Sequence, residues 1–197
     1  MTDGPRRGGR GRPGYDLDRL LQVAVTVFNE RGYDGTSMED LATRLGISKS
    51  AIYHHVSSKT ELLRLATDRA LDALFAVVSE PAGATAVERL EYVVRGSVGV
   101  LAEELPFVTL LLRVRGNTDV ERRALARRRE LDRRLTQLVR AAQEEGALPA
   151  DVDPALTARL IFGTVNSLVE WYRPGLALRA EALADALVAF AVPGPRG

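Results

Sequence analysis

The chain contains no cysteine and only two histidines, which are adjacent at His54 and His55. The lack of cysteine excludes disulfides, thiolate metal sites and a cysteine nucleophile, and it suits a reducing compartment, so we expect a cytoplasmic protein. Neighbouring residues of a helix point to different faces, so the two histidines predict no metal site. No apolar run approaches the roughly 20 residues that a membrane span needs, and no apolar segment follows the N-terminal arginines as it would in a signal peptide. We therefore expect no membrane association.

Lysine is almost as scarce, since Lys49 and Lys59 are the only two lysines among 27 basic residues. The formal net charge is only +1, but the basic residues are unevenly spread. Residues 1–14 hold four arginines against one aspartate, and residues 113–140 hold ten arginines against four acidic residues. A near-neutral total does not by itself indicate nucleic-acid binding, whereas local basic patches are compatible with it.

The apolar pattern of the chain is helical. Hydrophobic residues make up 46% of the 197 residues and charged residues 27%, which is typical of a globular protein. Apolar residues recur at intervals of three and four, and no alternating strand pattern competes with them. We therefore predict an all-α fold with nine helices. The expected helices cover residues 16–31, 37–45, 48–55, 58–79, 86–104, 106–114, 119–145, 155–173 and 179–192.

Capping residues place several of these boundaries. Ser37 is expected to cap the second helix, with Asp40 as its capping-box partner. Ser58 is expected to cap the fourth helix, with Glu61 in the same role. Asp119 is expected to cap the long arginine-rich helix.

Residues 37–56 combine two short helices with a glycine-containing turn, which is the arrangement of a helix-turn-helix. The apolar residues of the two helices would meet over Phe28, so that the polar residues of the second helix point outward. Such a helix fits the major groove of B-DNA, and its first turn reaches base edges. We predict a DNA-binding domain over 15–63, preceded by a flexible basic arm over 1–14 and followed by a ligand-binding and dimerisation domain over 64–197.

The outward residues of the second helix are candidate DNA contacts. Lys49 can donate to guanine O6 or N7, Ala51 can touch a thymine methyl, and Tyr53 can donate its hydroxyl to a phosphate. Lys59 and Ser37 lie at helix N-termini, where free backbone N–H groups favour a phosphate. The alternative is a three-helix packing unit whose polar residues are only solvated.

The segments 28–42 and 45–63 resemble the DNA-binding domain of the TetR family of bacterial repressors. The resemblance implies a homodimer that binds a palindromic operator in double-stranded DNA and releases it when a small molecule enters the C-terminal domain. It places Tyr53 and Lys59 at positions that contact phosphates. It places four residues at positions that face the bases: Lys49, Ser50, Ala51 and His54. The family's usual phenylalanine after the tyrosine-containing turn is Val56 here, a departure that affects packing.

The N-terminal arm has a motif of its own. Residues 10–13 resemble the core of a minor-groove AT-hook. Arg10 and Arg12 on a flexible strand can enter a narrow A·T-rich groove, where the negative potential is strongest. A solubilising tail is the alternative.

The C-terminal domain has no Gly-rich phosphate loop, no carboxylate pair on an apolar face and no serine with a nearby histidine, so we predict no enzyme activity and no cofactor. Its apolar helices carry isolated polar residues, which is typical of a pocket for a small effector. The candidate ligand contacts are Phe107, Leu110, Leu111, Phe162, Asn166, Glu170 and Trp171. For each residue alone, core or dimer packing is the competing interpretation. Gly163 and Ser167 would let the same helix of a second subunit approach closely, and with the last helix this would form a four-helix dimer interface.

The arginines of residues 119–145 have two interpretations, a solvated face or an anion site at the mouth of the pocket. Residues 171–175 are similar to a branch of the TetR family that responds to acyl-coenzyme A thioesters, whose phosphates suit arginine.

The sequence therefore predicts a ligand-responsive transcriptional regulator, specifically a repressor released by a small apolar or amphipathic effector. In the expected dimer the two recognition helices lie about 34 Å apart, one turn of DNA, and the effector tilts the 58–79 helix. The main alternative is a helical small-molecule-binding protein without DNA function, and an all-α enzyme is a third.

Overall fold

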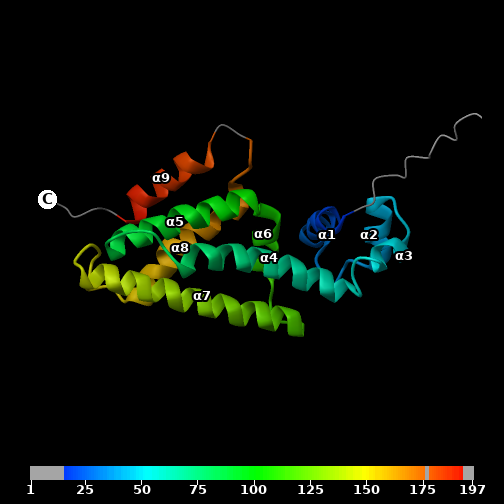
Figure 1. Ribbon diagram of the computed structural model, residues 1–197, viewed down its shortest axis with the longest axis horizontal. Coiled ribbons are helices and arrows are strands. Elements are labelled where there is room, and N and C mark those ends of the chain that lie inside the picture. Colours follow the sequence, from blue (N-terminus) through cyan, green and yellow to red (C-terminus); the bar gives the residue numbers. More distant parts are fainter. Residues whose placement is uncertain (1–15, 176–177, 193–197) are drawn as a thin grey trace, which may run out of the picture.

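The computed structural model describes residues 16–175 and 178–192, and within these ranges the chain forms nine helices and no strand (Figure 1). The predicted all-α class is confirmed. In chain order the helices are α1 (Leu17–Arg31), α2 (Met38–Leu45), α3 (Lys49–Tyr53), α4 (Lys59–Ser79), α5 (Ala86–Glu103), α6 (Leu105–Arg113), α7 (Asp119–Glu144), α8 (Pro154–Trp171) and α9 (Ala180–Ala191). Helices α1 to α3 form one end of the molecule, and α4 runs from them into a larger bundle (Figure 1).

The three N-terminal helices share a small apolar core. Leu41 and Leu45 of α2 are buried together with Phe28 of α1. Ile52 is the fully buried residue of α3 and turns one face of this short helix toward that core. Gly46 joins α2 to α3 with φ 67°, a left-handed conformation that favours glycine. The other face of α3 is left at the surface.

Two of the predicted caps involve serine. Ser37 caps α2 and forms the predicted capping box with Asp40. Ser58 caps α4 as predicted, because its hydroxyl accepts from the N–H of Glu61 at 3.1 Å. The Glu61 carboxylate does not close the expected box, since it accepts from the N–H and the hydroxyl of Ser57 instead.

Most other helix ends differ from the prediction by one or two residues, and two of these differences have a clear local reason. The prediction that Asp119 caps α7 is wrong, because Thr118 is the cap and Asp119 is the first helical residue. The Thr118 hydroxyl accepts from the N–H of Glu121 at 3.2 Å, and the Glu121 carboxylate accepts from the N–H of Thr118 at 2.9 Å. Helix α3 ends at Tyr53, with His54 as its C-cap, and so is shorter than predicted.

The larger bundle is built around α4, α5 and α7. Helix α4 packs against α6 and α7, α5 packs against α9, and α7 packs against α8. Helix α6 also contacts α1, so it lies between the N-terminal helices and the bundle. Two helices, α4 and α6, therefore connect the two ends of the molecule.

Gly96 on α5 allows a close approach to α4. A Cβ atom at this position would lie 2.5 Å from Cγ1 of Val77, well inside van der Waals contact. We expect Gly96→Ala to lower the free energy of unfolding by about 1–3 kcal/mol. Gly99 on the same helix has open space where its Cβ would lie, so Gly99→Ala is the matched control and should raise stability by up to about 1 kcal/mol through helix propensity. Chemical denaturation followed by circular dichroism measures both, and equal effects would contradict the close packing.

Candidate DNA-binding surface and effector cavity

Helix α3 presents an accessible first turn. Ser48 is its N-cap, and the Ser48 hydroxyl accepts from the N–H of Ala51 at 3.2 Å. The Tyr53 side chain is 46% exposed beside the buried Ile52. Of the residues expected to point outward, Ala51 is half-buried and the exposed ones are Lys49, Ser50, Tyr53 and His54. The side chains of Lys49, Tyr53 and His54 are thus accessible at the surface, while the Ser50 hydroxyl is hydrogen-bonded to the Ser48 hydroxyl at 2.9 Å.

The hydroxyl of Ser37, a predicted phosphate contact, is engaged within the protein. It donates to Oδ2 of Asp40 at 2.6 Å, and the same oxygen accepts the N–H of Ser37 at 2.8 Å. These hydrogen bonds from Ser37 hold the pKa of Asp40 below its ordinary value, so the carboxyl is ionised at neutral pH. A phosphate approaching the N-terminus of α2 would meet this negative charge, which weakens Ser37 as a phosphate contact.

Lys59 has a role that sequence reasoning missed. Its ammonium donates to the carbonyl oxygens of Tyr33 and Thr36, both at 2.8 Å, and lies 4.2 Å from the centre of the Tyr33 ring. These contacts tie the turn between α1 and α2 to the start of α4. An ammonium has three donors, so one N–H remains for a ligand such as phosphate.

Arg10 and Arg12, the predicted minor-groove contacts, lie outside the described residues.

Arg69 of α4 joins elements from both ends of the molecule. Its guanidinium makes two hydrogen bonds of 2.8 Å to the carboxylate of Glu104 and also pairs with Asp18 of α1. Hydrogen bonding to Glu104 is the main cause that raises the pKa of Arg69 above its ordinary value. The guanidinium carbon lies 4.3 Å from the centre of the Phe107 ring. This contact was not predicted, because the carboxylate partners lie 35 and 51 positions away along the chain.

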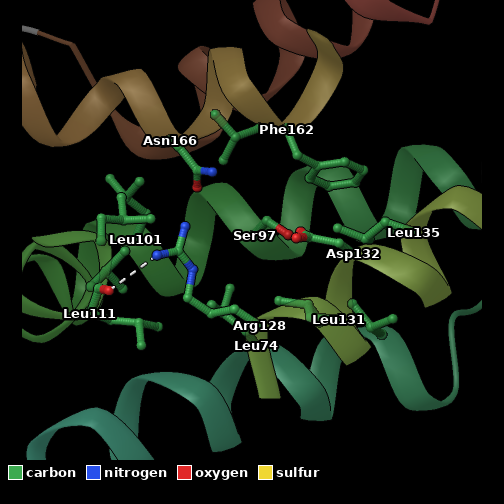
Figure 2. A pocket seen from close by; sticks show the side chains of 14 residues that line it. Leu74, Ser97, Leu101, Leu111, Arg128, Leu131, Asp132, Leu135, Phe162 and Asn166 are labelled. Carbon is green, nitrogen blue, oxygen red and sulfur yellow. Dashed lines mark hydrogen bonds between the residues drawn. The ribbon is translucent and has the colours of Figure 1, made fainter. Parts of the chain in front are cut away.

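A cavity of about 50 Å³ lies inside the bundle, between α4, α5, α6, α7 and α8 (Figure 2). Most of its lining is leucine, valine and phenylalanine. The polar lining residues are Ser97, Arg128, Asp132 and Asn166. The guanidinium of Arg128 projects between the helices, and it donates to the carbonyl oxygen of Leu111 at 3.4 Å (Figure 2).

A wider groove of about 260 Å³ adjoins this cavity. The two share Arg128, Asp132 and Phe162, among other residues. The groove adds Arg159 and Thr136 to the lining. An apolar interior therefore opens into a polar mouth that carries two arginines.

The predicted ligand contacts divide into two groups. Three of them line the cavity: Leu111, Phe162 and Asn166. The other four lie elsewhere: Phe107, Leu110, Glu170 and Trp171. Phe107 is buried beneath Arg69, and Leu110 faces a cleft beside the C-terminal end of α1. Glu170 and Trp171 are exposed on the last turn of α8, beyond the cavity.

The eight arginines of α7 do not share one environment. Four of them pair with acidic side chains: Arg122, Arg127, Arg133 and Arg134. Arg128 points into the cavity. Half of the eight arginines of α7 are thus ion-paired, and Arg128 is the one that lines the cavity.

Helices α8 and α9 each carry exposed large apolar side chains. Leu160 is 61% exposed, Trp171 53% and Phe190 76%. A Cβ atom at Gly163 would meet nothing within 4 Å, so the backbone of α8 is open to a close neighbour at this point. Exposed apolar side chains gathered on one face are typical of a protein interface.

Two kinds of site are absent from the part of the chain that the structure describes. Among these residues no group of three or more His, Asp or Glu is placed to hold a metal ion. Over the same residues no helix combines the length and apolar character that crossing a bilayer requires.

Two family models match the chain. One, described as "Tetracyclin repressor-like, C-terminal domain", covers residues 83–194, and the other, "Bacterial regulatory proteins, tetR family", covers residues 20–66. The chain therefore belongs to the tetR family of bacterial regulatory proteins, as the sequence resemblance predicts.

Individual relatives support the assignment over nearly the full length. The crystal structure of SCO3833, a TetR regulator from Streptomyces coelicolor A3, is 52% identical with a TM-score of 0.84, over 98% of this chain and 97% of that one. The HTH-type transcriptional repressor KstR2 of Mycobacterium tuberculosis is 29% identical over 89% of this chain and 90% of its own. AibR, solved in complex with isovaleryl coenzyme A and operator DNA, is 25% identical with a TM-score of 0.76, over 90% of this chain and 98% of that one.

Proposed function

We propose that this regulator is a ligand-responsive transcriptional repressor of the cytoplasm, which binds a palindromic operator as a homodimer and releases it when a small apolar or amphipathic effector enters the bundle. One observation carries the proposal. Helix α4 begins just after the exposed α3, and its Leu74 lines the cavity. A ligand that moves α4 therefore moves the surface that faces DNA.

On DNA, the first turn of α3 enters the major groove. Lys49 donates to guanine, and Ser50, Ala51 and His54 face the neighbouring base edges. Tyr53 and the third N–H of Lys59 contact phosphates. Arg10 and Arg12 reach the adjacent minor groove.

The effector is amphipathic in this proposal, because most of the cavity lining is apolar, whereas the adjoining groove is polar and holds Arg128 and Arg159 beside Asp132. An acyl-coenzyme A thioester fits this pattern, with its acyl chain among the leucines and its phosphates near Arg128 and Arg159. The complex of AibR with isovaleryl coenzyme A supports the same ligand class.

The dimer forms through the exposed apolar side chains of α8 and α9. Burial of side chains such as Leu160 and Phe190 supplies the driving force. The open backbone at Gly163 lets the two copies of α8 cross closely.

A gel-shift titration with the DNA upstream of the protein's own gene tests DNA binding. We expect the protein to bind this DNA at least about 10³ times more tightly than random DNA of equal length. Lys49→Ala should weaken the specific complex and leave the random complex nearly unchanged. Failure of the wild-type protein to bind either DNA would favour a small-molecule-binding protein without DNA function.

The effector class is tested on the complex of the wild-type protein with the same upstream DNA. Isovaleryl coenzyme A and palmitoyl coenzyme A are added in turn, with free coenzyme A as the control. We expect an acyl thioester to weaken operator binding about 5–150-fold, and Arg128→Gln to reduce that response. If no thioester changes operator affinity, the acyl-coenzyme A assignment is wrong.

A further inference from the structure

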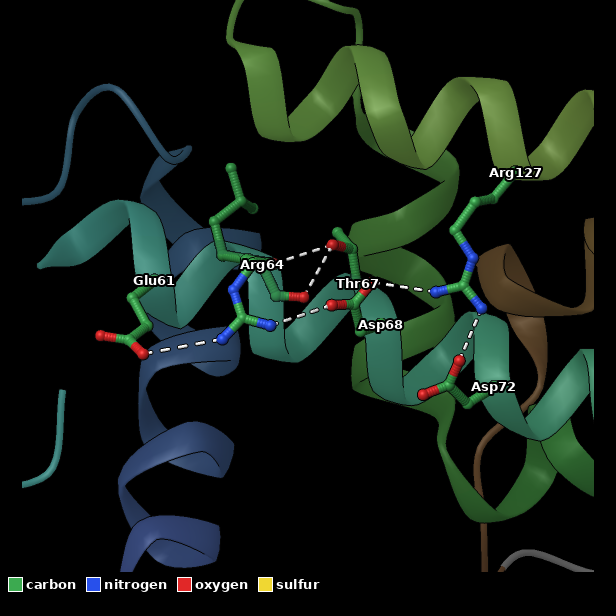
Figure 3. Close-up of polar contacts among 7 residues, drawn as sticks. Glu61, Arg64, Thr67, Asp68, Asp72 and Arg127 are labelled. Carbon is green, nitrogen blue, oxygen red and sulfur yellow. Dashed lines mark hydrogen bonds and ion pairs between the residues drawn. The ribbon is translucent and has the colours of Figure 1, made fainter. Parts of the chain in front are cut away.

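A chain of polar contacts runs along one face of α4 and joins α7 to the turn after α3. Figure 3 shows the part of this chain from Glu61 to Arg127. The members of this α4 ladder are Ser57, Glu61, Arg64, Asp68, Asp72 and Arg127. At one end, the N–H and the hydroxyl of Ser57 both donate to Oε2 of Glu61 at 2.6 Å. At the other end, Arg127 donates to Oδ1 of Asp68 at 2.9 Å and to Oδ1 of Asp72 at 2.6 Å. Arg64 connects the ends, since its guanidinium lies 3.6 Å from Glu61 and 3.2 Å from Asp68.

Each end of the α4 ladder adjoins one of the two candidate sites. Ser57 directly follows Val56, which is buried in the core that supports α3. Arg127 directly precedes Arg128, whose guanidinium lies in the cavity. A displacement of α7 by a ligand in the cavity therefore moves Arg127 as well.

The ladder has a shared member, which makes its contacts interdependent. An isolated exposed ion pair contributes little to stability. Asp68, however, accepts from both Arg64 and Arg127, so a shift of Arg127 changes the charge that Arg64 faces. Arg127 itself is half-buried, and its guanidinium carbon lies 5.3 Å from the centre of the Phe75 ring. Its position is thus fixed relative to both α4 and α7.

We propose that Arg127 is a positioning residue for the DNA-binding surface, and that the α4 ladder transmits its position from the cavity to the turn after α3. The inference rests on the proposed function, because it names the residues through which an effector acts on DNA binding. When Arg127 no longer pairs with Asp68, the Asp68 carboxylate attracts Arg64 more strongly. Arg64 then moves away from Glu61. Glu61 then holds the N–H of Ser57 less firmly, and α3 loses a fixed point at its C-terminal end.

The first test needs no DNA and no effector. Arg127→Gln removes the charge, and Arg129→Gln is the matched control, because Arg129 is exposed on the same helix and makes no ion pair within the described part of the chain. Amide hydrogen exchange, followed by NMR in the full-length protein, reports on the Ser57 N–H directly. We expect Arg127→Gln to accelerate exchange at Ser57 at least threefold, while Arg129→Gln leaves it unchanged.

Two further measurements distinguish the loss of the ladder contacts from a general loss of stability. Amides in the middle of α5, such as that of Val94, should exchange at the wild-type rate in both variants. The difference in the Ser57 exchange rate between Arg127→Gln and the wild type should disappear in 0.5 M NaCl, because salt screens exposed charges. Unchanged exchange at Ser57, or equal acceleration at Val94, would overturn the inference.

Operator binding supplies an independent test. Arg127→Gln and Glu61→Gln lie at opposite ends of the ladder, and substitutions at distant independent sites add in free energy. We expect the double variant to differ from additivity by at least about threefold in operator Kd. Additive effects would contradict the ladder. If the wild-type protein binds no DNA, the proposed function fails, while exchange at Ser57 still decides whether the ladder exists.

Discussion

Leu160→Glu is expected to convert the protein to a monomer and to weaken operator binding at least about 100-fold. Leu160 is 61% exposed on α8, and in the proposed dimer it is buried against the second copy. A glutamate there would place a charge in an apolar interface. A monomer binds only one half-site, and the loss of linked binding at the second half-site costs about 10²–10⁴ in affinity. Sedimentation velocity measures the oligomeric state, and a gel-shift titration measures the affinity.

Phe190→Glu on α9 should have the same effect, since Phe190 is 76% exposed and belongs to the proposed dimer interface. Ala126→Glu is the control, because it places the same charge on an exposed position of α7. All three variants should keep the helical circular dichroism spectrum of the wild type. A dimeric Leu160→Glu variant with wild-type affinity would show that the subunits meet through another surface.

Lys59→Met is expected to lower both the stability of the protein and its affinity for every DNA sequence. The substitution removes two hydrogen bonds of 2.8 Å to Tyr33 and Thr36 and the contact with the Tyr33 ring. Hydrogen bonds from a charged donor contribute about 1.5–3 kcal/mol each where they are buried, and Lys59 is half-buried, so we expect a total loss of about 1–3 kcal/mol. Denaturant unfolding checks this loss.

The DNA measurements separate the two roles of Lys59. If its third N–H contacts a phosphate, Lys59→Met reduces the salt dependence of binding by about one counterion per half-site, on specific and random DNA alike. Lys59→Arg keeps the charge but replaces the compact ammonium with a planar fork, so it should restore the salt dependence and only part of the stability. An unchanged salt dependence in Lys59→Met would show that Lys59 contacts no phosphate and only links the turn between α1 and α2 to the start of α4.

The helices and several caps were predictable because their signals are local. The Ser37–Asp40 capping box needs only two residues three positions apart, and the apolar period of each helix is contained within that helix. Thr118 was missed in favour of Asp119 because both are good capping residues, and only the backbone conformation decides between them.

The contacts that join the two ends of the molecule were not predictable. Arg69 meets Asp18 and Glu104 through the packing of three helices, and Arg127 meets Asp68 across 59 positions of sequence. The residues that line the cavity were predicted only in part for a related reason. Helix α8 is apolar on more than one side, and periodicity does not distinguish the side with Phe162, which lines the cavity, from the side with Leu160, which is exposed.

The small size of the inner cavity has a consequence for the speed of the response. A space of about 50 Å³ is far below the roughly 300–1,000 Å³ that a drug-sized molecule occupies in its pocket. In the proposed mechanism, an effector enters this space only after leucine side chains on several helices have separated. The rate of operator release would then reach a plateau as the effector concentration rises. At the plateau the opening of the helical bundle, rather than diffusion of the effector, would limit the rate.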